Sequence, residues 1–222
     1  MENRIIIITG PSGAGKTSLV NFLLSERDYD IIKVITTTTR ERRPGETHGK
    51  DYYFTSVREF QEAANGNSFV EYEEVFPGKY YGISKTEILR VLRKENTVPV
   101  IVMDIHGAMK FRNQISTTSN ESNGLIGLAS GIDYEFLDFH GVQFDFFFIY
   151  ADEEELINRI IKDNKNGERN DTLLGLEDRS ERIKTELAFK DFFSPEERVQ
   201  NSGDLNFVGN RVMNQILYPG VA

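Results

Sequence analysis

The residues best suited to chemistry lie at positions 10–17, where the chain reads GPSGAGKT. Gly10, Gly15, Lys16 and Thr17 match every fixed position of the phosphate-binding pattern G-x-x-x-x-G-K-[ST]. In such a loop the glycines let the backbone turn tightly and aim several N–H groups at one anion. The lysine reaches the β- and γ-phosphates, and the threonine hydroxyl holds Mg²⁺. We therefore predict a site for a nucleoside triphosphate, with Thr17 as the Mg²⁺ ligand.

The flanking sequence supplies the two elements that must position this loop. The apolar residues 5–8 are expected to form a buried strand, and residues 18–25 a helix whose positive N-terminal end begins near Lys16. A glycine-rich turn without a ligand is the alternative, and this strand–loop–helix context disfavours it. The residues predicted to bind the triphosphate are Gly10, Pro11, Ser12, Gly13, Ala14, Gly15, Lys16, Thr17 and Ser18.

Beyond the loop the chain alternates strands and helices, as in an α/β protein with a central, mainly parallel sheet and helices on both faces. Core strands are expected at residues 5–9, 98–103, 144–150 and 198–201, and a helix at 152–161 with Asp152 as its N-cap. The sequence therefore predicts the three-layer fold of P-loop NTPases.

We expect the 222 residues to form one domain with three parts. The core takes residues 1–33, 91–162 and 181–222, a small inserted lobe takes 34–90, and a lid takes 163–180. The lobe is expected from its short polar strands, turn signals and many aromatic residues, and the lid from a polar, glycine-containing segment typical of a mobile flap. The Ser/Asn/Gly-rich segment 113–133 is expected to be a surface loop.

Composition excludes several classes of function. The net charge of −9 argues against a nucleic-acid-binding surface, which needs a basic face. No apolar run approaches the roughly 18 residues of a membrane span, and the start MENRIIII does not read as a secretory signal. The absence of cysteine excludes disulfides and thiolate metal sites, and the three histidines have no metal-ligand spacing. We expect a cytoplasmic protein with no membrane partner.

A local basic cluster lies at residues 36–54, which read TTTTRERRPGETHGKDYYF. Arginine forks pair bidentately with phosphate oxygens, and a tyrosine hydroxyl is a good neutral phosphate donor. An ordinary charged hairpin is the alternative interpretation of such a cluster. On its own the cluster leaves a phosphate site and a charged hairpin open, and the hairpin is the more common case.

The order of these residues resembles the guanylate kinase family. The resemblance rests on TTTR-x-x-R-x-GE-x-x-GKDYYF, then FVEY at 69–72, KYYG at 79–82 and MDIHGA at 103–108, all behind the P-loop. It runs from residue 5 to about 110 and resumes more weakly from 144 to 205. It implies that the phosphate of GMP is held by Arg40, Arg43, Tyr52 and Tyr81, and that guanine is read by Thr36, Glu71 and Asp104.

The resemblance also implies an activity, ATP:GMP phosphotransfer with Mg²⁺ as cofactor, giving ADP and GDP. Its implied catalytic residues are Lys16, Arg43, Arg169 and Arg179, and Asn201 is expected near the base of ATP. Arg182, one helical turn from Arg179, competes for the lid role. Surface ion pairs with neighbouring acids are the alternative for these lid arginines.

One departure from the family pattern affects the base site. The family usually has Ser or Thr after YG, which adds a hydrogen bond to the base, whereas this chain has Ile83 followed by Ser84. Ser84 could substitute through a local shift, or the contact is missing.

Two rival functions and one segment stay open at this point. The rivals are a P-loop kinase for another small phosphorylated acceptor and a non-catalytic guanylate-kinase-like interaction module. Residues 113–140 form a longer segment than the resemblance predicts. A homodimer contact, a lineage-specific loop and a tolerated insertion are the alternatives for it.

Overall fold

The computed structural model describes residues 4–26, 30–118, 142–167 and 173–217. Its main sheet has five parallel strands in the order β2-β7-β1-β8-β9. These strands are β1 (Arg4–Thr9), β2 (Ile31–Lys33), β7 (Val98–Val102), β8 (Gln143–Tyr150) and β9 (Arg198–Gln200). The four predicted core strands are confirmed. The short edge strand β2 was not predicted, because three residues carry too little periodicity to be recognised.

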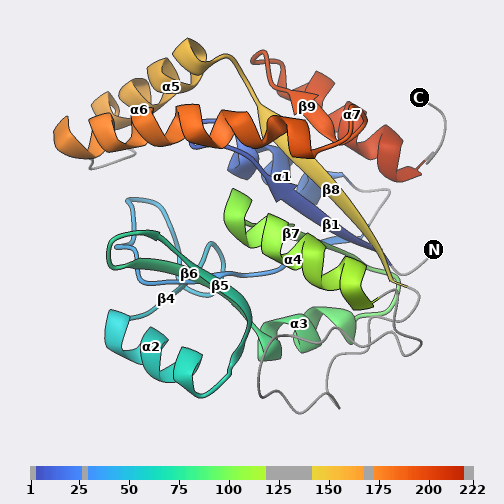
Figure 1. Ribbon diagram of the computed structural model, residues 1–222. Coiled ribbons are helices and arrows are strands. Elements are labelled where there is room, and N and C mark those ends of the chain that lie inside the picture. Colours follow the sequence, from blue (N-terminus) through green and yellow to red (C-terminus); the bar gives the residue numbers. More distant parts are fainter. Residues whose placement is uncertain (1–3, 27–29, 119–141, 168–172, 218–222) are drawn as a thin grey trace.

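Helices cover both faces of this sheet, as Figure 1 shows. Successive residues of β1 point to opposite sides, so Ile6 and Ile8 enter one apolar cluster while Ile5 and Ile7 enter the other. The first cluster is closed by α1 (Lys16–Ser25), α5 (Glu153–Lys165), α6 (Leu173–Ala188) and α7 (Leu205–Leu217), and the second by α3 (Lys85–Leu92) and α4 (Ile105–Thr118). A strand buried on both faces explains why the IIII run shows no polar alternation.

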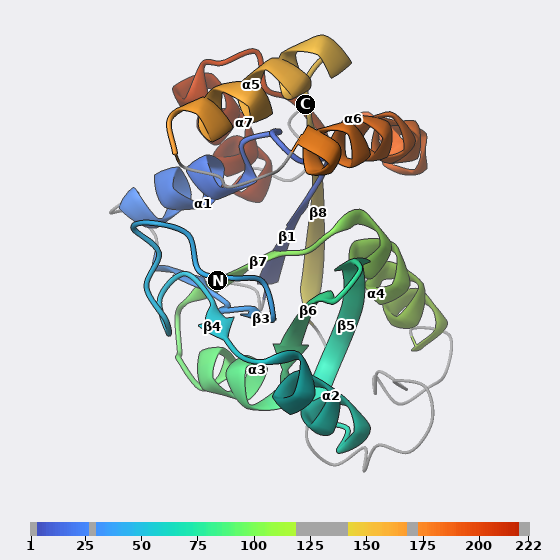
Figure 2. The ribbon, with the colours of Figure 1, turned by 90° about the vertical axis from the view of Figure 1, so that its left-hand side faces the viewer.

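A second, smaller sheet lies apart from the first, on the side away from α5, α6 and α7 (Figures 1 and 2). Its strand order is β4-β3-β6-β5, of mixed direction. The members are β3 (Thr37–Thr38), β4 (Tyr53–Phe54), β5 (Phe69–Phe76) and β6 (Lys79–Ser84), with α2 (Val57–Asn65) packed against them. The expectation of a separate small sheet in this part of the chain is confirmed.

Aromatic stacking replaces a large aliphatic core in this small lobe. Phe60 of α2 is 1% exposed, with ring centroids 4.4 Å from Phe69 and 5.4 Å from Tyr80. Gly82 lies under this stack, and a Cβ there would come within 2.9 Å of the Phe69 ring. Close ring packing is therefore the reason for the glycine at this strand position.

The lid predicted at residues 163–180 is mainly helical in its described part, with residues 163–165 in α5 and 173–180 in α6. One sequence expectation needs correction. In the predicted loop 113–133, residues 113–118 are the last part of α4, and the rest lies outside the described residues. Polar composition misled here, because a helix with a solvent-facing side is also rich in polar residues.

Two smaller points concern helix ends and membranes. Asp152 does occupy the N-cap of α5 with extended dihedrals, but its side chain caps no backbone N–H. Three glutamates in the first turn complement the helix dipole instead. Within the described ranges, no helix is both long and apolar enough to cross a bilayer.

Candidate active site

One cavity of about 690 Å³ opens between the carboxyl ends of the main-sheet strands and the small lobe. In parallel α/β sheets this edge is where ligands bind. Most sequence-predicted site residues line it, namely Gly10, Ser12, Gly13, Gly15, Lys16, Thr17, Ser18, Thr36, Arg40, Arg43, Tyr52, Glu71, Tyr81, Asp104, Arg179 and Asn201. Pro11 and Ala14 are not among its lining residues, and Arg169 lies outside the described residues.

The phosphate-binding loop joins β1 to α1 with an unusual backbone. Gly10 has φ 138°, and a Cβ there would lie 2.0 Å from the carbonyl oxygen of Ile149 in β8. Gly15 is the N-cap of α1 in the left-handed region. The Nζ of Lys16 donates to the carbonyls of Gly10 at 2.6 Å and Pro11 at 2.8 Å, so the ammonium lies over the loop. The loop therefore has the tight turns and the inward cation that a phosphate group requires.

Two residues from other elements brace this loop. The side-chain Nδ2 of Asn201, at the end of β9, donates to the carbonyl of Ala14 at 2.8 Å. Arg159 of α5 donates to the carbonyls of Gly13 at 3.3 Å and Asn201 at 2.9 Å. Sequence reasoning missed Arg159, because a single arginine on an amphipathic helix carries no signal that separates it from a surface residue.

The small lobe places a buried cation beside two tyrosine rings. Arg40 is 7% exposed, forms an ion pair with Glu46 at 2.7 Å and lies 5.3 Å from the centre of the Tyr52 ring. Tyr52 and Tyr81 are in edge-to-face contact, with ring centroids 6.1 Å apart. Burial, together with the neighbouring Tyr81, raises the pKa of Tyr52 to about 12. The Tyr52 hydroxyl is consequently a neutral hydrogen-bond donor at physiological pH.

Two buried carboxyl groups form the far wall of the cavity. Asp104 follows β7, and its Oδ1 accepts hydrogen bonds from the backbone N–H groups of His106 at 2.9 Å and Gly107 at 3.2 Å. Glu71 of β5 lies against the same turn, where a Cβ on Gly107 would come within 2.8 Å of its Oε1. That Oε1 is buried with no hydrogen-bond partner among the described residues.

The charge state of these carboxyl groups is set by their burial. Desolvation, followed by the nearby Asp104 carboxylate, raises the pKa of Glu71 to about 8. Burial also raises the pKa of Asp104, opposed by its backbone hydrogen bonds. A buried carboxyl oxygen without a partner is unusual in a folded protein and indicates a position for a ligand's hydrogen-bond donor.

Side chains of β6 alternate between the two faces of its sheet, and this separates the roles of Ile83 and Ser84. Ile83 is 1% exposed, pairs opposite Glu71 and lines the cavity. Ser84 caps α3 instead, where its Oγ accepts the backbone N–H of Glu87 at 3.2 Å. The suggestion that Ser84 substitutes at the base site is therefore wrong, because neighbouring strand residues face opposite sides. Thr36, 7% exposed, does line the cavity.

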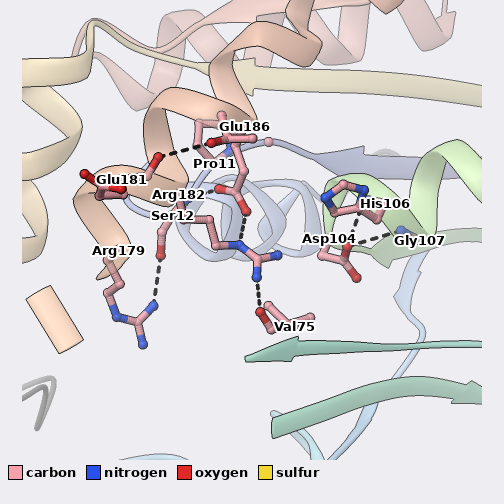
Figure 3. A network of polar contacts seen from close by, with 12 residues as sticks. Pro11, Ser12, Val75, Asp104, His106, Gly107, Arg179, Glu181, Arg182 and Glu186 are labelled. Carbon is pink, nitrogen blue, oxygen red and sulfur yellow. Dashed lines mark hydrogen bonds and ion pairs between the residues drawn. The ribbon is translucent and has the colours of Figure 1, made fainter. Parts of the chain in front are cut away.

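Helix α6 brings two arginines over the phosphate-binding loop (Figure 3). The guanidinium of Arg179 donates to the Oγ of Ser12 at 3.4 Å. Arg182 donates from Nε to Glu186 at 2.6 Å, and Glu186 accepts the backbone N–H of Ser12 at 3.3 Å. The ion-pair alternative thus holds for Arg182. Glu186, seven residues after Arg179 in the sequence, lines the cavity as well.

The cavity contains no ready-made metal cage. Among the described residues, no group of three or more His, Cys, Asp or Glu side chains could hold a metal ion. Mg²⁺ needs no such cage beside phosphates, because it keeps several waters and takes few protein ligands. Thr17, exposed at the start of α1 and lining the cavity, fits that requirement as a single hydroxyl ligand.

A parallel sheet with a phosphate-binding loop after β1 and a separate mixed lobe across the cavity defines a P-loop α/β protein with two facing binding regions. The family model described as guanylate kinase matches residues 2–123 of the chain. The chain belongs to the guanylate kinase family.

Individual relatives agree with this assignment. The guanylate kinase of Porphyromonas gingivalis is 40% identical over 109 residues, which are 49% of this chain and 57% of the relative. That of Blochmanniella floridana is 46% identical over 109 residues, 49% of this chain and 51% of the relative. In these alignments the chain spans about half the length of the curated relatives it matches.

A solved structure extends the similarity of fold to nearly the whole chain. The crystal structure of guanylate kinase from Anaplasma phagocytophilum has a TM-score of 0.64 and covers 97% of this chain and 85% of its own, at 22% identity. The predicted α/β fold is confirmed by this match and by the sheet topology.

Proposed function

We propose that this protein transfers the γ-phosphoryl group of ATP to GMP, giving ADP and GDP. The observation that carries the proposal is the buried, unpartnered Oε1 of Glu71, which shares one cavity with the P-loop lysine and the cationic lobe. A carboxylate at that place suits a base that presents N–H donors, and the facing P-loop suits a triphosphate.

The donor half of the site is the loop between β1 and α1. Lys16 is assigned to the β- and γ-phosphates and the loop N–H groups to the phosphate oxygens. Thr17 would hold Mg²⁺ through its hydroxyl, and the ion would supply neutralisation of the negative charge on the phosphates. Asn201 and Arg159 are assigned to hold the loop in shape, since Asn201 donates to the Ala14 carbonyl and Arg159 donates to the carbonyls of Gly13 and Asn201.

The acceptor half lies in the small lobe. Arg40 and Arg43 are assigned to the GMP phosphate, with the hydroxyls of Tyr52 and Tyr81 as further donors. Glu46 prepares this arrangement, because it accepts from the Arg40 guanidinium at 2.7 Å and from the Arg43 backbone N–H at 2.7 Å. A phosphate can therefore bind at an Arg40 guanidinium that is already oriented, which lowers the cost of ordering it.

Glu71, Asp104 and Thr36 are assigned to the base. Guanine presents N1–H and N2–H₂ donors on one edge, which complement carboxylate oxygens. Adenine presents an acceptor at N1, which would face a carboxylate lone pair. A buried mismatch of this kind costs about 1–3 kcal/mol or more, which is enough for strong discrimination.

The transfer itself is mainly positioning and charge neutralisation. An oxygen of the GMP phosphate attacks the γ-phosphorus, the bond to the β-phosphate oxygen breaks, and ADP leaves with that electron pair. No general base is required, because the GMP phosphate is already ionised at neutral pH. Lys16, Arg43 and Arg179 are assigned to the charge on the transferred group, and Arg169 remains a proposal from sequence.

The test is a coupled assay for ADP formation with GMP, AMP, CMP and UMP as acceptors. We expect turnover with GMP to exceed the others at least 100-fold, in line with a hydrogen-bonded base site. Equal rates for all four would remove the base-reading role of Glu71 and Asp104. Lys16→Met should abolish turnover and leave GMP binding within about twofold, since Lys16 belongs to the donor half.

The same experiments separate the rivals. An ATP-dependent rise in melting temperature without a GMP-dependent rise would favour a kinase for another phosphorylated acceptor. Absence of both would favour an interaction module, although Gly10, Gly15, Lys16 and Thr17 are intact.

We also infer a cytoplasmic location from the absence of cysteine, testable by cell fractionation. The homodimer alternative is tested by analytical ultracentrifugation.

A further inference from the structure

A chain of contacts connects the phosphate-binding loop to the tip of the small lobe through helix α6 (Figure 3). The backbone N–H of Ser12 donates to Glu186, and Glu186 accepts from the Nε of Arg182. The other side of the Arg182 guanidinium donates to the carbonyl of Val75, near the end of β5. The Arg182 side chain therefore contacts the lobe directly and the phosphate-binding loop through Glu186.

A second set of contacts also connects the lobe to the phosphate-binding loop, through Phe76 and Arg179. The guanidinium carbons of Arg179 and Arg182 both lie 4.8 Å from the centre of the Phe76 ring, the last residue of β5. Arg179 returns to the loop through the Oγ of Ser12 at 3.4 Å. Phe76 is thus held by two cations of the same helix, a contact that is favourable when it is shielded from water. We call these five residues, Ser12, Phe76, Arg179, Arg182 and Glu186, the α6 clamp.

The burial of the Arg182–Glu186 pair separates it from ordinary surface pairs. Its side chains are 22% and 8% exposed, whereas Arg58 and Glu62 of α2, also four residues apart, are 86% and 63% exposed. Exposed pairs of this spacing contribute little, since water and salt screen them. A largely buried guanidinium with three directed contacts holds one geometry instead.

We propose that Arg182 is a positioning residue that couples the donor loop to the acceptor lobe. The proposal rests on the function proposed above and deepens it. A phosphate at the loop competes with Glu186 for the Ser12 N–H and attracts Arg179, so occupancy of the loop changes what α6 presents to Val75 and Phe76. The contacts of α6 to Val75 and Phe76 set the position of the lobe relative to the loop, and both ligands depend on that position. ATP and GMP therefore strengthen each other's binding.

The first test measures the position of the lobe without using activity. The chain has no cysteine, so Lys79→Cys at the start of β6 and Lys162→Cys on α5, both exposed, can carry two spin labels. We expect Arg182→Ala to lengthen and broaden the distance distribution between the labels, and Arg182→Lys to give an intermediate result. The matched control Arg58→Ala removes the exposed pair of the same spacing and should leave the distribution unchanged. Identical distributions in the parent and Arg182→Ala would overturn the proposal.

The second test measures the linkage between the two ligands. The Kd of GMP is determined by calorimetry with and without a non-hydrolysable ATP analogue, and the reverse titration gives the same ratio by thermodynamic necessity. We expect Arg182→Ala to reduce that ratio at least fivefold, and Glu186→Gln to act in the same direction. The double variant should be no worse than the more affected single variant, because the two side chains act as one unit. An unchanged ratio in Arg182→Ala would refute coupling.

The outcomes also distinguish this inference from the proposed function. Absence of GMP phosphorylation by the unaltered chain would remove the proposed function, while the spin-label distances would still test the clamp. Normal GMP phosphorylation with unchanged distances and unchanged linkage would remove the clamp alone. A circular-dichroism melt of each variant identifies one that fails to fold, and Arg182→Lys then supplies the deciding comparison.

Discussion

The buried carboxyl of Glu71 makes the stability of the ligand-free protein depend on pH. Burial, followed by the repulsion of Asp104, raises its pKa from 4.5 to about 8, with Lys110 acting in the opposite direction and Glu73 in the same direction. The folded protein therefore holds this proton more tightly than the unfolded chain does. The favourable contribution is complete below pH 4.5 and is lost as the pH rises through about 8.

The size of the effect follows from the interval between the two pKa values. At about 1.4 kcal/mol for each pH unit, the interval from 4.5 to about 8 corresponds to a loss of up to about 5 kcal/mol. A loss of that size is a large share of the roughly 5–15 kcal/mol that stabilises a typical domain. Glu71→Gln keeps the shape of the side chain and cannot ionise, so it should remove this dependence.

The assay is urea unfolding of the two proteins at intervals between pH 5 and pH 8.5. We expect the free energy of unfolding of Glu71→Gln to increase relative to that of the unaltered protein as the pH rises, because only the unaltered protein loses stability over this range. Glu62→Gln, whose side chain is 63% exposed, is the control for losing a glutamate. A difference between Glu71→Gln and the unaltered protein that stays constant across this range would refute the reasoning. GMP should also release protons on binding at pH 7, because its N–H donors require the ionised carboxylate and the pKa of Glu71 in the ligand-free protein is raised to about 8.

Two further substitutions separate the halves of the site. Gly107→Ala places a Cβ 2.8 Å from the Oε1 of Glu71, so we expect GMP to bind at least 10-fold more weakly. We expect the melting temperature to stay the same or rise, because alanine favours the α4 helix over glycine by about 1 kcal/mol. Calorimetry with GMP and a thermal melt check this split, and a fall in both would contradict it. Arg159→Ala removes contacts to the Gly13 and Asn201 carbonyls, so we expect KM for ATP to rise about 10-fold with GMP binding within twofold, from loss of about 1.4 kcal/mol. Steady-state kinetics against Arg58→Ala check it, and an equal loss for both substrates would contradict it.

Features of the fold and the site that depend on neighbouring residues could be predicted from the sequence. The P-loop could be predicted, because its glycines, lysine and threonine lie within eight residues and their spacing alone defines the loop. The buried strand before it was equally plain, since IIII suits only a strand or helix covered on both sides. The edge strand β2 was missed, and residues 113–118 were interpreted as part of a loop because their polar composition hides the end of α4.

Residues whose roles come from contacts between distant elements could not be predicted in the same way. Arg159 contacts a carbonyl 146 positions away, and the Glu186 carboxylate contacts an N–H 174 positions away. In the sequence Arg159 does not differ from an ordinary helical surface residue, and only the resemblance to the guanylate kinase family, which has an acid seven residues after the lid arginine, draws attention to Glu186. Their function depends on where α5 and α6 cross the main sheet, which no local pattern encodes.

The side chains of β5 and β6 alternate between the two faces of the small sheet, and this local rule could have predicted more of the site than it did. Glu71 and Ile83 are register partners on neighbouring strands, so an inward Glu71 places Ile83 inward and Ser84 outward. The same alternation turns Gly82 toward Phe69, where only a glycine fits. With Ile83 at the cavity wall, the proposed base recognition is assigned to Glu71, Asp104 and Thr36, and an apolar side chain adjoins them. The proposed selectivity for guanine would thus depend on carboxyl groups whose charge depends on pH, and this makes the Glu71 titration the most direct test of that proposal.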